Sequence, residues 1–120
     1  MNKPTLVIGA STNPERYSFK AITSLVNHGY KVYALGLKPG NLVGIEFDTE
    51  RRHYDDIDTI SLYVGPQNQP SYYDYIESLN PKRVIFNPGT ENDEFAVRLE
   101  AKGIEVLEAC TLVLLSTKQF

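Results

Sequence analysis

Short apolar runs alternate along this chain with longer segments in which apolar residues recur at helical spacing. The short runs are rich in β-branched side chains and lack polar alternation, which is typical of strands buried on both faces of a parallel sheet. We expect strands at Thr5–Gly9, Lys31–Leu35, Ile60–Val64, Arg83–Phe86 and Ile104–Leu107. This order predicts an α/β fold, a three-layer Rossmann-like doubly wound domain with a mainly parallel sheet of five to six strands.

The segments between the runs carry the signals of crossover helices. Glycines or an Asn-Pro pair follow them, and these residues commonly end helices. The predicted helices are Ser18–His28, Ser71–Leu79 and Asn92–Lys102. The run Thr111–Leu115 has the composition of a sixth strand, but its place after the last strand–helix unit favours a final helix.

The stretch from Gly36 to Asp58 has no clear helical period. Lys38–Gly40 predicts a turn, and Gly44–Phe47 predicts a short edge strand. A connection of this length in a small domain is usually either a binding loop or an element that the pattern does not reveal.

Composition limits the classes of function. With 120 residues and 42% hydrophobic content, the chain has the size of one domain, residues 1–120. A net charge of −3 argues against a nucleic-acid partner, and no apolar run is long enough to span a membrane. We therefore expect a cytoplasmic protein. Cys110 is the only cysteine, so neither an intrachain disulfide nor a thiolate-rich metal site is expected.

The first predicted strand breaks at Gly9 into a small polar turn that leads into a helix. Gly9 and Ala10 allow a ligand close to the backbone, and a helix N-terminus attracts phosphate. Donors follow at Ser11, Thr12, Asn13 and Arg16. The alternative is that these polar residues only cap the helix. The second and third glycines of the dinucleotide motif are missing, so an ordinary NAD site is not expected.

The turn after the second strand holds Lys38 and Pro39, where NAD sites usually place an acidic residue that binds the ribose. A lysine attracts a phosphorylated ribose, which both NADP and coenzyme A (CoA) carry. The alternative is a solvated lysine in a turn.

Later loops are shaped by proline and glycine and carry amides that could bind a polar ligand. The candidate residues there are Gly65, Pro66, Asn87, Pro88 and Gly89, and the alternative is ordinary turn chemistry. Arg51–His53, followed by two aspartates, has the pattern of a charged surface loop. The best explanation of Tyr72, Tyr73 and Tyr75 is packing of their rings in the core, with the hydroxyl groups at an edge that water reaches.

Several of these segments together resemble a known family. The segment Val7–Arg16 with Ser18, the second strand with Leu37–Pro39, Gly44, the Asn-Pro-Gly turn at 87–89 and Cys110 match it in position. The chain resembles the small stand-alone CoA-binding proteins, which are related to the CoA-binding N-terminal domain of the succinyl-CoA synthetase α subunit.

The resemblance implies that the 3′-phosphoadenosine and pyrophosphate of CoA lie across Ser11, Thr12, Arg16, Ser18 and Lys38, with Tyr17 alongside. The pantetheine arm would run toward the later loops. No catalytic residue carries over from the synthetase, and Cys110 keeps two interpretations, a contact to a thiol ligand or an inert buried thiol.

The expectation is a module that binds CoA or an acyl-CoA without catalysing a reaction, alone, as a homo-oligomer or with a protein partner. Two alternatives stay open. One is an NADP-dependent oxidoreductase, and the other is a structural interaction domain whose nucleotide site has decayed.

Overall fold

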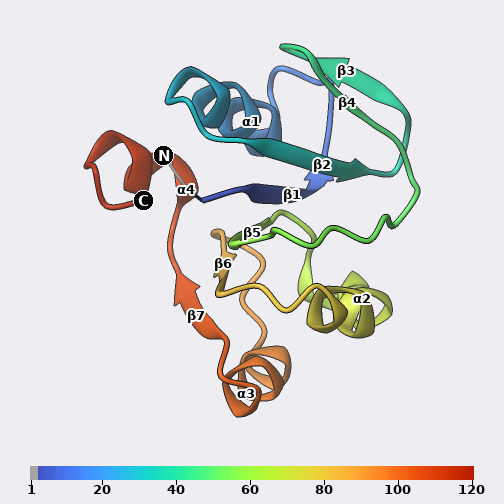
Figure 1. Cartoon of the computed structure of the whole chain (residues 1–120), viewed down its shortest axis with the longest axis vertical. Helices are drawn as coiled ribbons and strands as arrows, with labels where there is room; N and C mark the ends of the chain where they lie inside the picture. The colour runs from blue at the N-terminus through green and yellow to red at the C-terminus, as the bar shows by residue number, and fades with distance from the viewer. Residues whose placement is uncertain (1–2) are drawn as a thin grey trace.

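The computed structural model describes residues 3–120, and a five-stranded parallel sheet crosses the centre of the molecule. Its strand order is β2-β1-β5-β6-β7, with every neighbouring pair parallel (Figure 1). The strands are β1 (Thr5–Ala10), β2 (Val32–Gly36), β5 (Thr59–Leu62), β6 (Arg83–Phe86) and β7 (Glu105–Glu108). All five predicted strands are present, and the predicted Rossmann-like α/β fold is confirmed.

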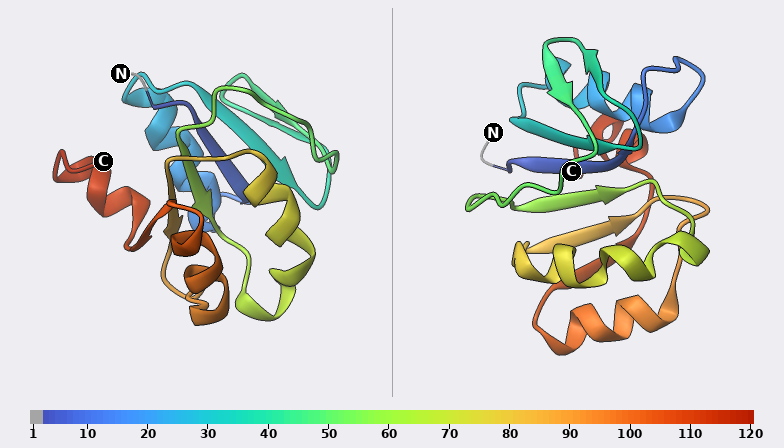
Figure 2. Two further views of the ribbon diagram at one scale, coloured as in Figure 1. Left: turned by 60° about the horizontal axis from the view of Figure 1, so that its bottom comes forward. Right: turned by 90° about the vertical axis from the view of Figure 1, so that its right-hand side faces the viewer.

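Helices cover both faces of the sheet (Figure 2). The faces are covered by α1 (Tyr17–Asn27) with α4 (Thr111–Ser116), and by α2 (Tyr73–Ser78) with α3 (Asp93–Ala101). Alternate residues of β1 point to opposite layers, as the twofold repeat of a strand requires. Leu6 packs in the layer of α2 and α3, whereas Val7 packs in the layer of α1 and α4.

The second crossover helix begins later than predicted. Two 3₁₀ turns, Pro66–Asn68 and Pro70–Tyr72, come first, and α2 begins only at Tyr73. Proline at the first position of each turn fixes φ and offers no N–H, so it starts a turn but cannot continue an α-helix. The final helix α4 is confirmed in place of a sixth strand.

The irregular stretch contains a β-hairpin rather than an edge strand of the main sheet. Strands β3 (Gly40–Leu42) and β4 (Ile45–Phe47) pair with each other, and the two residues between them have positive φ, 47° at Val43 and 86° at Gly44. A two-residue turn with this geometry matches the twist of a hairpin. The hairpin lies beside β2, where the Gly36 N–H donates to the Asp48 carbonyl at 3.0 Å. An extended segment, residues 48–58, then leads to β5.

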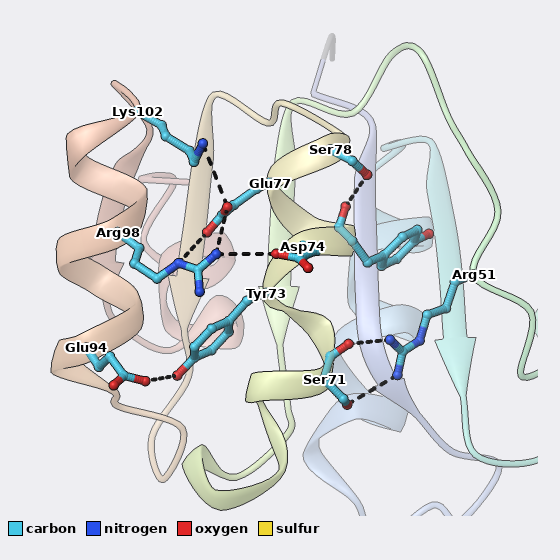
Figure 3. A network of polar contacts seen from close by, with 10 residues as sticks. Arg51, Ser71, Tyr73, Asp74, Glu77, Ser78, Glu94, Arg98 and Lys102 are labelled. Carbon is cyan, nitrogen blue, oxygen red and sulfur yellow. Dashed lines mark hydrogen bonds and ion pairs between the residues drawn. The ribbon is translucent and has the colours of Figure 1, made fainter.

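Polar contacts connect α2 with α3 at the surface (Figure 3). Glu77, whose side chain is only 10% exposed, accepts from Nε and Nη2 of Arg98 at 2.9 and 3.0 Å. Nearby, the Tyr73 hydroxyl donates to Glu94 at 3.0 Å. Tyr73 itself is buried and stacks on Phe95. Its ring is therefore packed while its hydroxyl makes a polar contact near the surface, as predicted. These contacts hold the two helices in one orientation on their face of the sheet.

Candidate functional site

The main cavity lies where the strand order reverses. From β1 the chain moves outward to β2 and then returns to the other side of β1 to form β5, so the switch point falls between β1 and β5. Ligands of doubly wound folds bind beyond the carboxyl ends of the strands at such a point. A cavity of about 880 Å³ lies there, and its walls come from the loops that follow β1, β2 and β5, together with Phe47 and Arg51.

The structure brings most of the predicted site residues to this cavity. Those that line it are Gly9, Ala10, Ser11, Thr12, Asn13, Arg16, Lys38, Pro39 and Gly65. Others of the predicted set lie outside its lining, namely Tyr17, Ser18, Pro66, Asn87, Pro88 and Gly89. The loops after β1, β2 and β5 therefore meet around one cavity, whereas residues 87–89 after β6 lie outside its lining.

Asn87, in the loop after β6, is buried and its amide bonds within the protein. Its Nδ2 donates to Ser61 Oγ and to the Leu62 carbonyl, each at 3.0 Å, and its Oδ1 accepts from the Thr111 N–H at 2.9 Å. This side chain joins β5, β6 and α4. The sequence suggested an amide free to bind a ligand, whereas the structure shows that this amide already makes three hydrogen bonds within the protein.

The loop after β1 owes its shape to Gly9 and to two polar side chains. Gly9 has φ +99°, and a Cβ there would meet the Tyr63 carbonyl oxygen at 2.8 Å. The close approach of β1 to the residue after β5 therefore requires glycine. Ser11 Oγ accepts from the Asn13 N–H and Asn13 Oδ1 accepts from the Glu15 N–H, both at 3.0 Å. These side chains therefore stabilise the turn itself.

The start of α1 is left without a side-chain cap. Arg16 occupies the N-cap position in an extended conformation, and its side chain makes no capping hydrogen bond. In the part of the chain that the structure describes, the N–H groups of Tyr17, Ser18 and Phe19 donate to no acceptor. The interpretation that Ser11 and Asn13 serve as caps of α1 is therefore wrong, and the positive end of the helix dipole remains uncompensated beside the cavity.

Two glycines let the loop after β2 lie directly against the loop after β1. A Cβ at Gly36 would meet the Ala10 carbonyl oxygen at 2.7 Å, and one at Gly40 would meet Thr12 Cγ2 at 2.7 Å and Phe47 Cζ at 2.6 Å. Lys38 lies between these glycines in sequence and is exposed at the cavity. The close contact of the two loops thus brings Lys38 and Arg16 to the same cavity.

Arg51 is a cavity residue that the sequence did not indicate. It was predicted in a charged surface loop, and its neighbour Arg52 fits that prediction, since Arg52 pairs with Asp48 and Glu50 at 2.9 and 3.0 Å. Arg51 is also an exposed loop residue, but in addition it lines the cavity and places its guanidinium 4.0 Å from the centre of the Tyr72 ring. No local pattern distinguishes these adjacent arginines, because the difference arises from the packing of residues 48–58 against the start of the α2 region.

The cavity has a strongly positive lining. Arg16, Lys38 and Arg51 all line it, and none of its lining residues is acidic. The whole chain carries a net charge of −3, so this concentration of cations is local. Cations without neighbouring carboxylates at a cavity raise the local concentration of anionic ligands.

Tyr63 lines this cavity with a half-buried side chain whose hydroxyl is buried. Its side chain belongs to the layer of α1 and α4, and burial raises the pKa of the phenol to about 12. Among residues 3–120 its hydroxyl has no hydrogen-bond partner. The nearby hydroxyls of Ser61 and Thr111 bond to each other at 2.8 Å. Tyr63 is therefore a protonated phenol at neutral pH.

The family model described as a CoA binding domain matches residues 3–116. The chain belongs to this CoA-binding domain family. A comparison with curated proteins finds no match.

Solved structures share the fold of this CoA-binding domain. A crystal structure of an uncharacterized protein has 46% identity and a TM-score of 0.97, with 100% of this chain and 99% of that chain covered. A hypothetical protein from Pyrococcus horikoshii has 27% identity and a TM-score of 0.82, with 93% and 80% covered.

A more distant likeness shows the fold alone. The dinucleotide-forming acetyl-coenzyme A synthetase 1 of Ca. Korarchaeum cryptofilum, in complex with phosphate and ADP, has 20% identity and a TM-score of 0.75. The match covers 89% of this chain but only 25% of the synthetase. Within residues 3–120 of the CoA-binding domain, no helix is long and apolar enough to cross a membrane.

Proposed function

We propose that this domain binds CoA or an acyl-CoA in the cavity between the ends of β1, β2 and β5, as a binding or sensing module that catalyses no reaction. The observation that carries the proposal is the lining of that cavity, which presents Arg16, Lys38 and Arg51 and no acidic side chain. CoA combines a pyrophosphate with a phosphorylated ribose, so it matches a cavity with several separated cations.

Each part of the ligand has a place that its chemistry favours. The pyrophosphate would lie on the loop Ser11–Arg16, where an uncapped helix begins. The ribose phosphate would lie toward Lys38, because the loop after β2 is where doubly wound folds recognise the ribose. The pantetheine arm would then leave along the loop after β5, past Tyr63 and Gly65.

Calorimetric titration of the protein with CoA, dephospho-CoA, NAD and NADP tests the proposal. We expect saturable binding of CoA and weaker binding of dephospho-CoA, by about tenfold or more, because a charge-assisted hydrogen bond contributes about 1.5 to 3 kcal/mol. Lys38→Gln should weaken CoA and leave dephospho-CoA nearly unchanged. Lys82→Gln is the matched control, since Lys82 is exposed and precedes β6 at the opposite end of the sheet.

NADP is the rival ligand, because it also carries a ribose phosphate and Lys38 stands where an NAD site would have an acid. Competition decides between the two ligands. If NADP binds and CoA does not displace it, the cavity serves an NADP-dependent protein, and the CoA proposal is wrong. If neither nucleotide binds, the interpretation as an interaction domain with a decayed site gains support.

A further inference from the structure

Arg51 connects the two sides of the cavity. It lies three residues after Asp48, whose carbonyl accepts from Gly36 at the end of β2. Its guanidinium reaches across to the 3₁₀ turn Pro70–Tyr72 that precedes α2. There Nη1 donates to the Ser71 carbonyl and Nη2 donates to Ser71 Oγ at 3.4 Å (Figure 3). The main chain of Arg51 therefore lies in the segment after β4 that borders the end of β2, and its guanidinium is held by residues that follow β5.

All the groups that hold Arg51 are neutral. They are the Ser71 carbonyl and hydroxyl and the face of the Tyr72 ring. Within residues 3–120 no carboxylate lies within ion-pair distance of Arg51, whereas Arg52 has two. The positive charge of Arg51 thus remains available to a ligand, while its guanidinium lies over the face of the Tyr72 ring at 4.0 Å.

Donors also remain available on this guanidinium. An arginine has five N–H donors, and Ser71 accepts from two of them, so three remain for a ligand. A planar fork that is bonded to Ser71 on one side suits a phosphate better than a mobile lysine does, because less side-chain freedom is lost on binding.

The position of Arg51 selects one phosphate of the ligand. The uncapped N-terminus of α1 belongs to the layer of α1 and α4, whereas Tyr72, beneath Arg51, packs in the layer of α2 and α3. The phosphate loop and Arg51 therefore face the cavity from opposite layers. The main chain of Arg51 follows Asp48, which bonds the end of β2, the strand that Lys38 follows, and its guanidinium extends from there to Ser71 and Tyr72.

We propose that Arg51 is a specificity residue that, together with Lys38, recognises the 3′-phosphate on the ribose of CoA. This inference rests on the proposed function, since it requires CoA in this cavity. It adds a second cation to Lys38, from a segment distant from the phosphate loop.

The test compares CoA with dephospho-CoA in the wild type, Arg51→Gln and Arg52→Gln. We expect Arg51→Gln to weaken CoA binding by about 10- to 100-fold and dephospho-CoA by less than about threefold. Arg52→Gln should leave both affinities unchanged, because Arg52 is already paired with two carboxylates. Retained binding of dephospho-CoA by Arg51→Gln shows in the same sample that the cavity is folded.

Equal loss of both ligands in Arg51→Gln would overturn the inference, because it would assign Arg51 to the pyrophosphate or to the fold. Unchanged CoA binding, or an equal loss in Arg52→Gln, would overturn it as well. A wild-type protein that binds no CoA would instead remove the proposed function, so the two failures are distinguishable.

Discussion

The side-chain carbonyl of Asn87 accepts a hydrogen bond from the backbone N–H of Thr111 at 2.9 Å, which ties the end of β6 to the first residue of α4. The Nδ2 atom of the same side chain donates to Ser61 Oγ and the Leu62 carbonyl on β5. One buried amide thus links three elements that are far apart in the sequence, and it does so at the carboxyl edge of the sheet where the cavity lies.

Replacing Asn87 by alanine should destabilise the protein strongly. Three buried hydrogen bonds are lost and their partners remain in a site with little access to water, so we expect the free energy of unfolding to fall by roughly 2 to 4 kcal/mol. Urea unfolding measures this loss. Asn41→Ala is the control, because Asn41 is exposed on β3. If both variants lose equally little, the amide cluster does not hold the edge of the sheet.

Gln69 connects the loops after β5 and β6 in a similar way. It is fully buried, and its Nε2 donates to the carbonyls of Val64 at 2.8 Å and Thr90 at 2.7 Å. Gln69→Ala should lower the free energy of unfolding by roughly 2 to 3 kcal/mol and speed hydrogen exchange in both loops. The exposed Gln67, in the neighbouring turn, provides the matched control Gln67→Ala. Slow exchange retained in both loops of Gln69→Ala would contradict this role.

Gly36→Ala tests the contact between the first two loops. The new Cβ would meet the Ala10 carbonyl oxygen at 2.7 Å, and a backbone atom cannot move aside as a flexible side chain can. We expect a loss of about 1 to 3 kcal/mol in the free energy of unfolding and weaker ligand binding. Gly65→Ala is a fitting comparison for stability, since its Cβ would meet only the end of the Gln67 side chain, at 3.0 Å. Equal stability of the two variants would show that the loops can separate without cost.

Tyr63→Phe removes a buried hydroxyl that has no partner within residues 3–120. At pH 8 we expect the free energy of unfolding to stay the same or to rise by about 1 kcal/mol, since no hydrogen bond is lost. Tyr17→Phe, at a tyrosine that is 65% exposed, is the control. A clear loss of stability in Tyr63→Phe at this pH would mean that the hydroxyl does have a partner.

The same variant makes a prediction about alkaline pH. Burial raises the pKa of Tyr63 to about 12 from its ordinary value of 10.0, so between these values the folded protein binds more protons than the unfolded chain. Stability that is fully present below pH 10 is therefore lost as pH rises through 12, by up to roughly 2 to 3 kcal/mol. Urea unfolding from pH 8 to 11 should show a smaller loss in Tyr63→Phe than in the wild type. Parallel decreases in both proteins would contradict the raised pKa.

The sequence predicted the sheet well because β1, β2, β5 and β6 are largely buried and appear as short runs rich in apolar residues. The edge strand β7 is half-buried at its centre and exposed at both ends. Between Gly36 and Asp58 the sequence predicted the strand that the structure shows as β4 but missed its partner β3. The hairpin turns at Val43, a β-branched residue with φ 47°, a conformation that such residues seldom adopt. That turn depends on tertiary packing, in which Phe47 lies against Gly36 and Gly40.

The sequence predicted those site residues that directly follow a strand of the main sheet, and it missed a site residue that tertiary contacts place at the cavity. The loops at Gly9–Arg16 and Lys38–Pro39 follow strands, so topology alone places them at the cavity. Arg51 follows no strand of the main sheet, and its place depends on a contact with Ser71 that no spacing predicts. Asn87 does follow a strand, but only the structure shows that its amide is already bonded.

The hairpin formed by β3 and β4 stands where a crossover helix would usually complete the fold. Its ladder has only three residue pairs, too few for independent stability, so its order depends on Phe47 packing near Gly36 and Gly40. We expect it to open at a lower free energy than the five-stranded sheet, which hydrogen exchange would report. If CoA binds as proposed, fluctuation of this hairpin and the adjoining Arg51 segment would open one wall of the cavity without unfolding the five-stranded sheet.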